Sequence, residues 1–229
     1  MDKKQALILV ASAAGLGLIL IGISQRGRIA MTLYELLALE LLDPKDFPNE
    51  KDKFLNTSYE EWLKLVFERA SKYLSAKQAV MVLAKHIQEQ AGTPEDTIFA
   101  KKFYSLFGIK ATNWWIGRIH GNPLYYYTES GTSEEVGGKI IHIRDRFRAY
   151  TNPDVAILDF IKLLQKLYPN VLYKPLMDGD VERFAEGFVT KDPSTGCKYM
   201  TSSQGKQGYL GAYNRAVKFV REKLGIKEV

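Results

Sequence analysis

The chain has 229 residues, of which 46% are hydrophobic and 25% charged, and this composition is typical of a globular protein. A single cysteine, Cys197, excludes an internal disulfide scaffold. The net charge of +6 favours anionic surroundings, but the basic residues are scattered, with no Arg-rich run and no zinc-ligand spacing, so we expect no nucleic-acid partner.

An uncharged apolar run near the start of the chain, residues 6–24, approaches the ~20 residues that a helix needs to cross a bilayer. Two lysines precede it and two arginines follow it, so the flanking charges do not set its orientation. A cleaved signal peptide is the alternative, but the run is long and no small-x-small cleavage site follows it. We therefore expect residues 1–28 to be an uncleaved membrane anchor with a single transmembrane helix.

Residues 29–55 are expected to connect this anchor to a folded domain. They begin with an apolar helical pattern, IAMTLYELLALELL, which fits a helix at the membrane surface or one packed on the domain. The next stretch, DPKDFPNEKDKF, has two prolines and many charges, as linkers do. The folded domain is then predicted to span residues 56–229.

Helix-start signals divide the first part of this domain into three helices. SYEE at 58–61 is a capping box, in which the first and last side chains satisfy free backbone N–H groups, and it predicts a helix ending near Tyr73. SAKQ at 75–78 is a second capping box, and its helix should end near Glu89. A threonine followed by a proline predicts a third helix over 94–104.

The region that follows the third helix has a different character, rich in glycine, aromatic and β-branched residues. KIIHIRDRF at 139–147 alternates as a strand does, and the two glycines before it are a turn signal. We therefore predict a β-hairpin or small sheet. Further helices are expected near residues 153–167, 179–188 and 209–224. The fold class is α+β and mostly α.

Several short motifs follow the second predicted helix in a defined order. They are Glu89 near a helix end, LFGIK at 106–110, WIG at 115–117, TSE at 132–134, GK at 138–139, FRAY at 147–150 and GFVTKDP at 187–193. Their order and spacing resemble the glucosaminidases of glycoside hydrolase family 73, over about residues 58–224. The resemblance implies a lysozyme-like domain, in which a helical lobe and a small β-lobe enclose a glycan cleft.

The resemblance also implies a reaction, cleavage of the β-1,4 bond after N-acetylglucosamine in peptidoglycan, with Glu89 as the general acid. An acid is disfavoured at a helix C-terminus, and a catalytic role would explain its presence there. Glycoside cleavage needs a proton for the leaving oxygen, and apolar surroundings keep a carboxyl protonated near neutral pH. We expect Phe107 and Phe188 to supply such surroundings. From the residues alone, Glu89 would be an exposed helix-end acid.

Glu134 is the candidate for the second catalytic acid, because the family places one in this β segment. It would activate water or stabilise the positively charged sugar. Glu135 is its neighbour, and composition does not separate the two. A mechanism that uses the acetamido group of the sugar as nucleophile would lessen the need for either.

Aromatic residues that cluster in the β segment are expected to cover the apolar C–H faces of sugars, with core packing as the alternative for about half of them: Trp114, Trp115, Tyr125, Tyr126 and Tyr127. The substrate-binding candidates are Phe107, Trp115, Tyr150 and Phe188, the last of which replaces a tyrosine of the family. The three histidines show no metal-ligand spacing, so we expect neither a metal nor a cofactor.

The sequence thus predicts a membrane-anchored endo-β-N-acetylglucosaminidase whose partners are peptidoglycan glycan strands and, through residues 6–24, a membrane. Its catalytic domain would lie on the cell-wall side of a bacterial envelope or of the membrane of a virus particle. One alternative is a muramidase or lytic transglycosylase on a similar fold. The other is a non-catalytic protein that binds glycan or has a structural role at a membrane.

Overall fold

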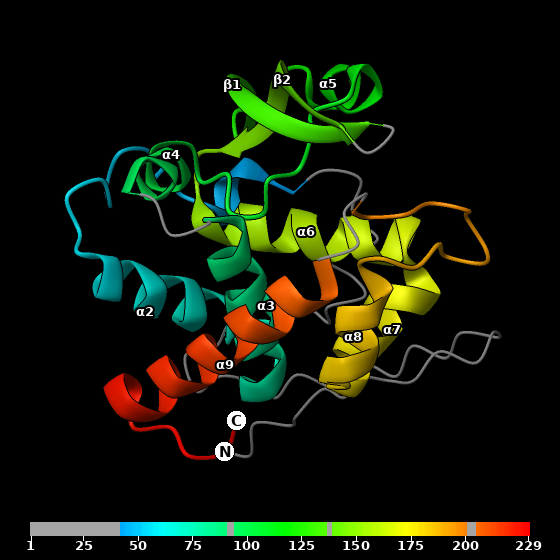
Figure 1. The fold of residues 1–229 in the computed structure, drawn as a ribbon. Coiled ribbons are helices and arrows are strands. Elements are labelled where there is room, and N and C mark those ends of the chain that lie inside the picture. Colours follow the sequence, from blue (N-terminus) through cyan, green and yellow to red (C-terminus); the bar gives the residue numbers. More distant parts are fainter. Residues whose placement is uncertain (1–41, 91–93, 137–138, 201–204) are drawn as a thin grey trace, which may run out of the picture. The chain divides into compact units, whose positions relative to one another are not determined.

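Helix α3 (Ala76–Glu89) lies at the centre of the fold, with a β-hairpin on one side and the long C-terminal helix on the other (Figure 1). The structure is a computed structural model, and it describes residues 42–90, 94–136, 139–200 and 205–229. The other elements are η1 (Pro44–Asp46), α2 (Tyr59–Ala70), α4 (Pro94–Phe103), α5 (Asn113–Ile119), β1 (Tyr125–Val136), β2 (Lys139–Tyr150), α6 (Pro153–Leu167), the π-helical turn η2 (Pro169–Tyr173), α7 (Lys174–Asp178), α8 (Val181–Gly187) and α9 (Gly205–Leu224).

The two predicted capping boxes are confirmed by their hydrogen bonds. Ser58 and Glu61 form a complete capping box at the start of α2, and Ser75 and Gln78 form one at the start of α3. The Asn152 side chain accepts from the backbone N–H of Asp154 and so begins α6. These bonds satisfy N–H groups that have no partner within the helix.

Helix α3 is buried on nearly all sides, which explains its mostly apolar sequence. Residues 79–87 are all buried, and the helix packs against α2, α7 and α9. A helix that is apolar around its whole circumference belongs in a core. Its C-terminal end, at Glu89 and Gln90, lines a pocket.

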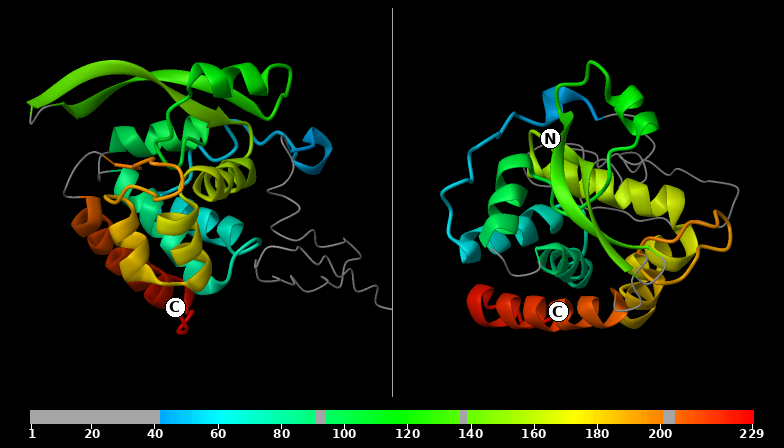
Figure 2. Two further views of the ribbon diagram at one scale, coloured as in Figure 1. Left: turned by 90° about the vertical axis from the view of Figure 1, so that its right-hand side faces the viewer. Right: turned by 45° about the horizontal axis from the view of Figure 1, so that its top comes forward.

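The predicted hairpin is present as two antiparallel strands, β1 and β2. Its register runs from Tyr125 opposite Tyr150 to Val136 opposite Lys139. Helix α5 packs on β1 and α6 packs on β2, so the base of the hairpin is fixed to the helices. Its far end extends beyond them (Figure 2). The described residues are therefore mostly helical with one small sheet, as the sequence predicts.

The stretch expected to be a linker belongs instead to the folded unit, whose described residues begin at Leu42. Glu50 is buried and forms an ion pair with Arg69 of α2, with 2.9 Å between Arg69 Nη2 and Glu50 Oε2. Asn152 Nδ2 donates to Pro48 O at 2.9 Å. Buried Phe47 and Glu50 therefore attach this stretch to the folded unit.

The transmembrane prediction falls on residues that the structure does not describe. Within the described ranges, none of the helices combines the length and apolar character needed to cross a bilayer. Residues 6–24 lie outside those ranges, so the anchor stays a prediction.

Candidate active site

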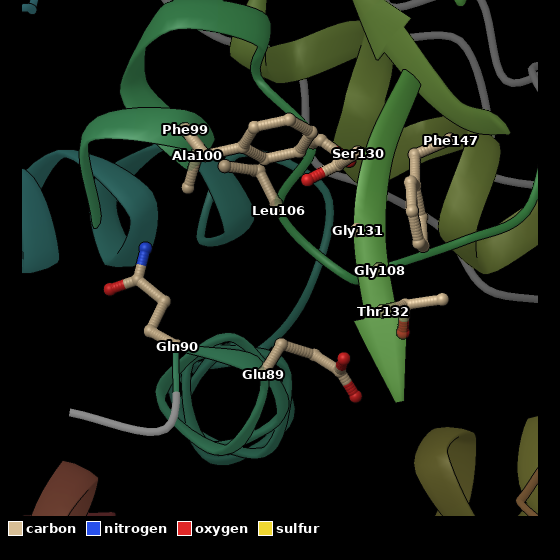
Figure 3. Close-up of a pocket in the computed structure, with 11 residues that line it drawn as sticks. Glu89, Gln90, Phe99, Ala100, Leu106, Gly108, Ser130, Gly131, Thr132 and Phe147 are labelled. Atoms are coloured by element: carbon tan, nitrogen blue, oxygen red, sulfur yellow. The ribbon is translucent and has the colours of Figure 1, made fainter. Parts of the chain in front are cut away.

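A pocket of about 390 Å³ lies where the C-terminal end of α3 faces the hairpin (Figure 3). It is lined by Glu89 and Gln90 of the α3 end, Phe99 and Ala100 of α4, Ser105, Leu106 and Gly108 of the following loop, Ser130, Gly131 and Thr132 of β1, and Phe147 of β2. The lining combines two aromatic side chains with several hydroxyl groups and one carboxyl group. This mixture suits a ligand that has both apolar faces and hydroxyls.

Glu89 is the acidic residue of this pocket. Its side chain is 26% exposed and its carboxyl group is directed towards Thr132 on β1 (Figure 3). A ligand that fills the space between α3 and β1 would therefore meet this group. The structure thus places Glu89 where the sequence analysis expects the general acid.

Gly108 makes room for the Glu89 carboxyl group. Its φ is +59°, in the left-handed region that favours glycine. A Cβ atom at this position would lie 2.5 Å from Glu89 Oε2. The glycine of the LFGIK motif is therefore required by both backbone conformation and space.

His86 ties the LFGIK loop to α3. Its Nε2 accepts from Trp62 Nε1 at 2.9 Å, which leaves Nδ1 to donate to Leu106 O at 2.9 Å. Burial lowers the pKa of His86 to about 4, although the hydrogen bond to Leu106 acts in the opposite direction. A neutral, fixed histidine thus holds the loop that carries Gly108 beside Glu89.

The immediate partner of Glu89 is a cation, not the apolar surroundings that the sequence analysis expects. Lys85 Nζ donates to Glu89 Oε1, one helical turn earlier on α3. The Lys85 side chain is completely buried. Phe188 lies against this lysine, whose Nζ is 4.9 Å from the centre of its ring.

The four aromatic residues predicted to bind substrate are core residues, so this prediction is corrected. None of them is among the residues that line the pocket, and each is at most 4% exposed: Phe107, Trp115, Tyr150 and Phe188. Their roles are structural because each has partners in the core. Phe107 stacks on Phe160 of α6 at 4.1 Å between ring centres, and the Tyr150 hydroxyl donates to Asp159 Oδ2 at 2.6 Å.

Trp115 and Phe188 are held by similar contacts. Trp115 packs against Tyr125 and lies under the Arg148 guanidinium, 4.8 Å from it. Phe188 packs against Tyr209 of α9, with 5.1 Å between ring centres. The aromatic residues that do line the pocket are Phe99 and Phe147, which the sequence analysis did not select.

Glu134, the candidate second acid, is placed by its backbone alone. It lies in β1 opposite Ile141, two residues beyond the pocket residue Thr132. Its side chain lies outside the described part of the structure, as does that of Glu135, so the choice between them stays open. Among the described residues, no group of histidine, cysteine and acidic side chains could hold a metal ion.

Two site residues that the sequence analysis missed have recognisable signals. Lys85 precedes Glu89 by four residues, and residues so spaced are neighbours on a helix surface. Thr132 belongs to the TSE motif, which was used only to locate Glu134. The burial of Lys85 has no local signal, because lysine is seldom fully buried.

Comparison with known proteins identifies structures but no sequence family. No family model matches the chain, and no curated protein matches it either. A crystal structure of a peptidoglycan hydrolase mutant from Sphingomonas sp. A1 is similar to this chain, with a TM-score of 0.51 and 21% identity over 70% of this chain and 97% of that one. This likeness shows the fold.

A second solved structure is a C-terminally truncated glycoside hydrolase domain from Salmonella typhimurium FlgJ. It has a TM-score of 0.41 and 18% identity, and the match covers 69% of this chain and 97% of that one.

Proposed function

We propose that this protein hydrolyses the glycan strands of peptidoglycan as an endo-β-N-acetylglucosaminidase, with Glu89 as its general acid. The observation that carries the proposal is the partly exposed Glu89 carboxyl group, held at the end of a buried helix and facing a pocket bounded by the hairpin. The fold adds support, since the Sphingomonas protein of similar fold is a peptidoglycan hydrolase.

The proposed reaction begins with proton transfer from Glu89 to the glycosidic oxygen. The bond between that oxygen and the anomeric carbon of N-acetylglucosamine then breaks, and positive charge develops on the sugar ring. Water adds its hydroxyl to the anomeric carbon, and its other proton restores the acid form of Glu89 through solvent, so one water molecule is consumed for each bond. A positioned acid of this kind contributes typically ~10²–10⁴-fold to the rate.

The pocket lining supports a sugar as the ligand. Phe99 and Phe147 offer aromatic surface for the C–H faces of a sugar ring, and Ser130 and Thr132 offer hydroxyl groups for hydrogen bonds. These residues come from α4 and from both strands of the hairpin. Substrate would therefore contact the helices and the hairpin together.

Glu134 is the proposed second acid. Residues two apart on a strand share a face, and Glu134 is two residues from Thr132, which lines the pocket. In this role it would activate the attacking water or stabilise the positive charge on the sugar. If the acetamido group of the substrate acts as the nucleophile instead, replacing Glu134 will have a small effect.

A location at the cell wall follows from this substrate. The predicted anchor, residues 6–24, would hold the domain on the wall side of a bacterial envelope or of the membrane of a virus particle. High salt distinguishes an inserted helix from a protein held at the membrane by charge. Ions screen the attraction between surface charges, but they do not reverse the insertion of an apolar helix. The full chain should therefore stay with membranes in high salt.

The test is digestion of purified peptidoglycan by the full chain, followed by mass spectrometry of the released fragments. N-acetylglucosamine at the new reducing ends supports the proposal. Muramic acid at the reducing ends would identify a muramidase, and an anhydro-muramic end a lytic transglycosylase. Binding to peptidoglycan without release of fragments would identify a non-catalytic protein.

A further inference from the structure

A buried lysine lies beside the proposed general acid. Lys85 is 0% exposed, and its Nζ donates to Glu89 Oε1 and, at 3.3 Å, to Gln88 Oε1. Removing an ammonium group from water is strongly unfavourable unless its surroundings compensate for the lost hydration. The residues around Lys85 must therefore compensate for the lost hydration of its ammonium group.

Two aromatic rings also lie close to the ammonium group. Lys85 Nζ lies 4.9 Å from the ring centre of Phe188 and 4.9 Å from that of Tyr199. The face of an aromatic ring attracts a cation, and this attraction is stronger away from water. We call these two rings the aromatic clamp.

The aromatic clamp is itself fixed to the fold. The backbone N–H of Met200 donates to Phe188 O at 2.9 Å, which ties together the two chain segments that carry the rings. The Tyr199 hydroxyl donates to the carbonyl oxygen of Phe107, the neighbour of Gly108, at 3.4 Å. Lys85 is therefore held in one position relative to the LFGIK loop.

This arrangement gives the two oxygens of Glu89 different surroundings. Oε1 accepts from Lys85, whereas Oε2 lies over Gly108. From this geometry we infer that Lys85 is a positioning residue for Glu89, which fixes the carboxyl group through Oε1 and leaves Oε2 to deliver the proton. The inference rests on the proposed function, because it assigns the oxygen that acts in that reaction.

The charge of Lys85 also acts on the reaction. When Glu89 gives its proton to the glycosidic oxygen, negative charge develops on the carboxylate, and the adjacent ammonium group stabilises it. Interactions that strengthen as the transition state forms increase the rate of the chemical step. Lys85 need not touch substrate for this effect, so it should influence kcat and leave KM nearly unchanged.

The first test is Lys85→Met, which keeps an unbranched side chain but removes the charge. We expect kcat on peptidoglycan to fall about 10²-fold, the loss that follows a misplacement of about 1 Å in an active site. KM should stay within about twofold of the wild-type value. In a Glu89→Gln background, Lys85→Met should cause no further loss, because its effect passes through Glu89. Unchanged kcat with a lower melting temperature would show a purely structural lysine and overturn the inference.

The second test does not depend on activity. In a crystal structure of the Lys85→Met protein, the Glu89 carboxyl group should have left its place over Gly108, and an unmoved group would overturn the positioning role. Lys85→Gln, which also lacks the charge, serves if Lys85→Met does not fold. An inactive wild-type protein would defeat the proposed function, and the crystal structure would still decide the role of Lys85.

Discussion

Gly108 and Glu89 are in such close contact that no other residue fits at position 108 without moving the carboxyl group. A Cβ atom there would lie 2.5 Å from Glu89 Oε2, nearer than real Cβ atoms approach an oxygen. Glu89 is only partly buried, so its side chain can turn away into the pocket. A change at Gly108 should therefore affect activity more than folding.

The first prediction is that Gly108→Ala lowers kcat by about 10²-fold, the effect of a catalytic group displaced by about 1 Å. Its positive φ adds a strain of roughly 1–2 kcal/mol, which the free energy of unfolding will report. Gly196→Ala is the matched control, since Gly196 has φ +70° and nothing within 4 Å of its Cβ position. A similar loss of kcat in both variants would show that strain, not displacement of Glu89, is responsible.

The second prediction concerns Gly187, in the GFVTKDP motif. A Cβ atom at Gly187 would lie 1.8 Å from the backbone oxygen of Val171 in η2, and backbone cannot move aside as a side chain can. Gly187→Ala should therefore destabilise the protein by about 3 kcal/mol, the upper part of the range for overpacking, as measured by urea unfolding.

Gly211→Ala is the control for Gly187→Ala. Gly211 lies in α9 with nothing within 4 Å of its Cβ position, so alanine should stabilise that helix by about 0.5–1 kcal/mol. Equal stability of the Gly187→Ala and wild-type proteins would mean that α8 and η2 do not pack as closely as described.

The predictions from sequence hold for features whose partners lie close along the chain, and they fail for features whose partners lie on a distant element. The capping boxes at Ser58 and Ser75 were predictable because their partners lie three residues away. The supposed linker was wrong because the partner that fixes Glu50 is Arg69, on another element. Prolines and charges in a short stretch indicate its local backbone preference, but they do not show which distant residues it pairs with.

The candidate site shows the same division. Glu89 was selected from its place at a helix end within the motif order, and it lines the pocket. Phe107 was misplaced because sequence does not show whether an aromatic ring faces a pocket or, as here, stacks on Phe160 in the core. The aromatic clamp around Lys85 joins α3 to the segment after α8, and no local pattern connects them.

The third prediction uses His86, whose pKa burial lowers from 6.5 to about 4. Between these pH values the unfolded chain binds a proton that the folded protein does not. The contribution of His86 to the free energy of unfolding is therefore fully present above pH 6.5 and is lost as the pH falls to about 4. The 2.5-unit difference between the two pKa values corresponds to about 3 kcal/mol.

The measurement for His86 is the free energy of unfolding at several pH values between 7 and 4, for wild type and His86→Gln. Glutamine can accept from Trp62 and donate to Leu106 but does not titrate in this range. Carboxyl groups contribute equally to both proteins, so the difference isolates the histidine. Parallel pH profiles would show that folding does not lower the pKa of His86.

The last prediction concerns Phe188, which the sequence resemblance aligns with a tyrosine of family 73. Its ring is 0% exposed and packs against Phe184 and Tyr209. In Phe188→Tyr the added hydroxyl would be buried, and an unsatisfied buried hydroxyl costs about 1–3 kcal/mol. We expect a lower melting temperature and no gain in the initial rate on peptidoglycan, because the residue does not line the pocket.

Phe188→Leu tests whether this ring only fills the core or also positions Lys85. Both Phe188→Tyr and Phe188→Leu disturb the core, but only Phe188→Leu removes an aromatic face from Lys85, whose Nζ lies 4.9 Å from the ring centre. If the aromatic clamp positions Lys85, kcat should fall for Phe188→Leu and stay near the wild-type value for Phe188→Tyr. A faster Phe188→Tyr enzyme with unchanged stability would instead place the edge of this ring in the active site, and the packing of Phe188 described above would be wrong.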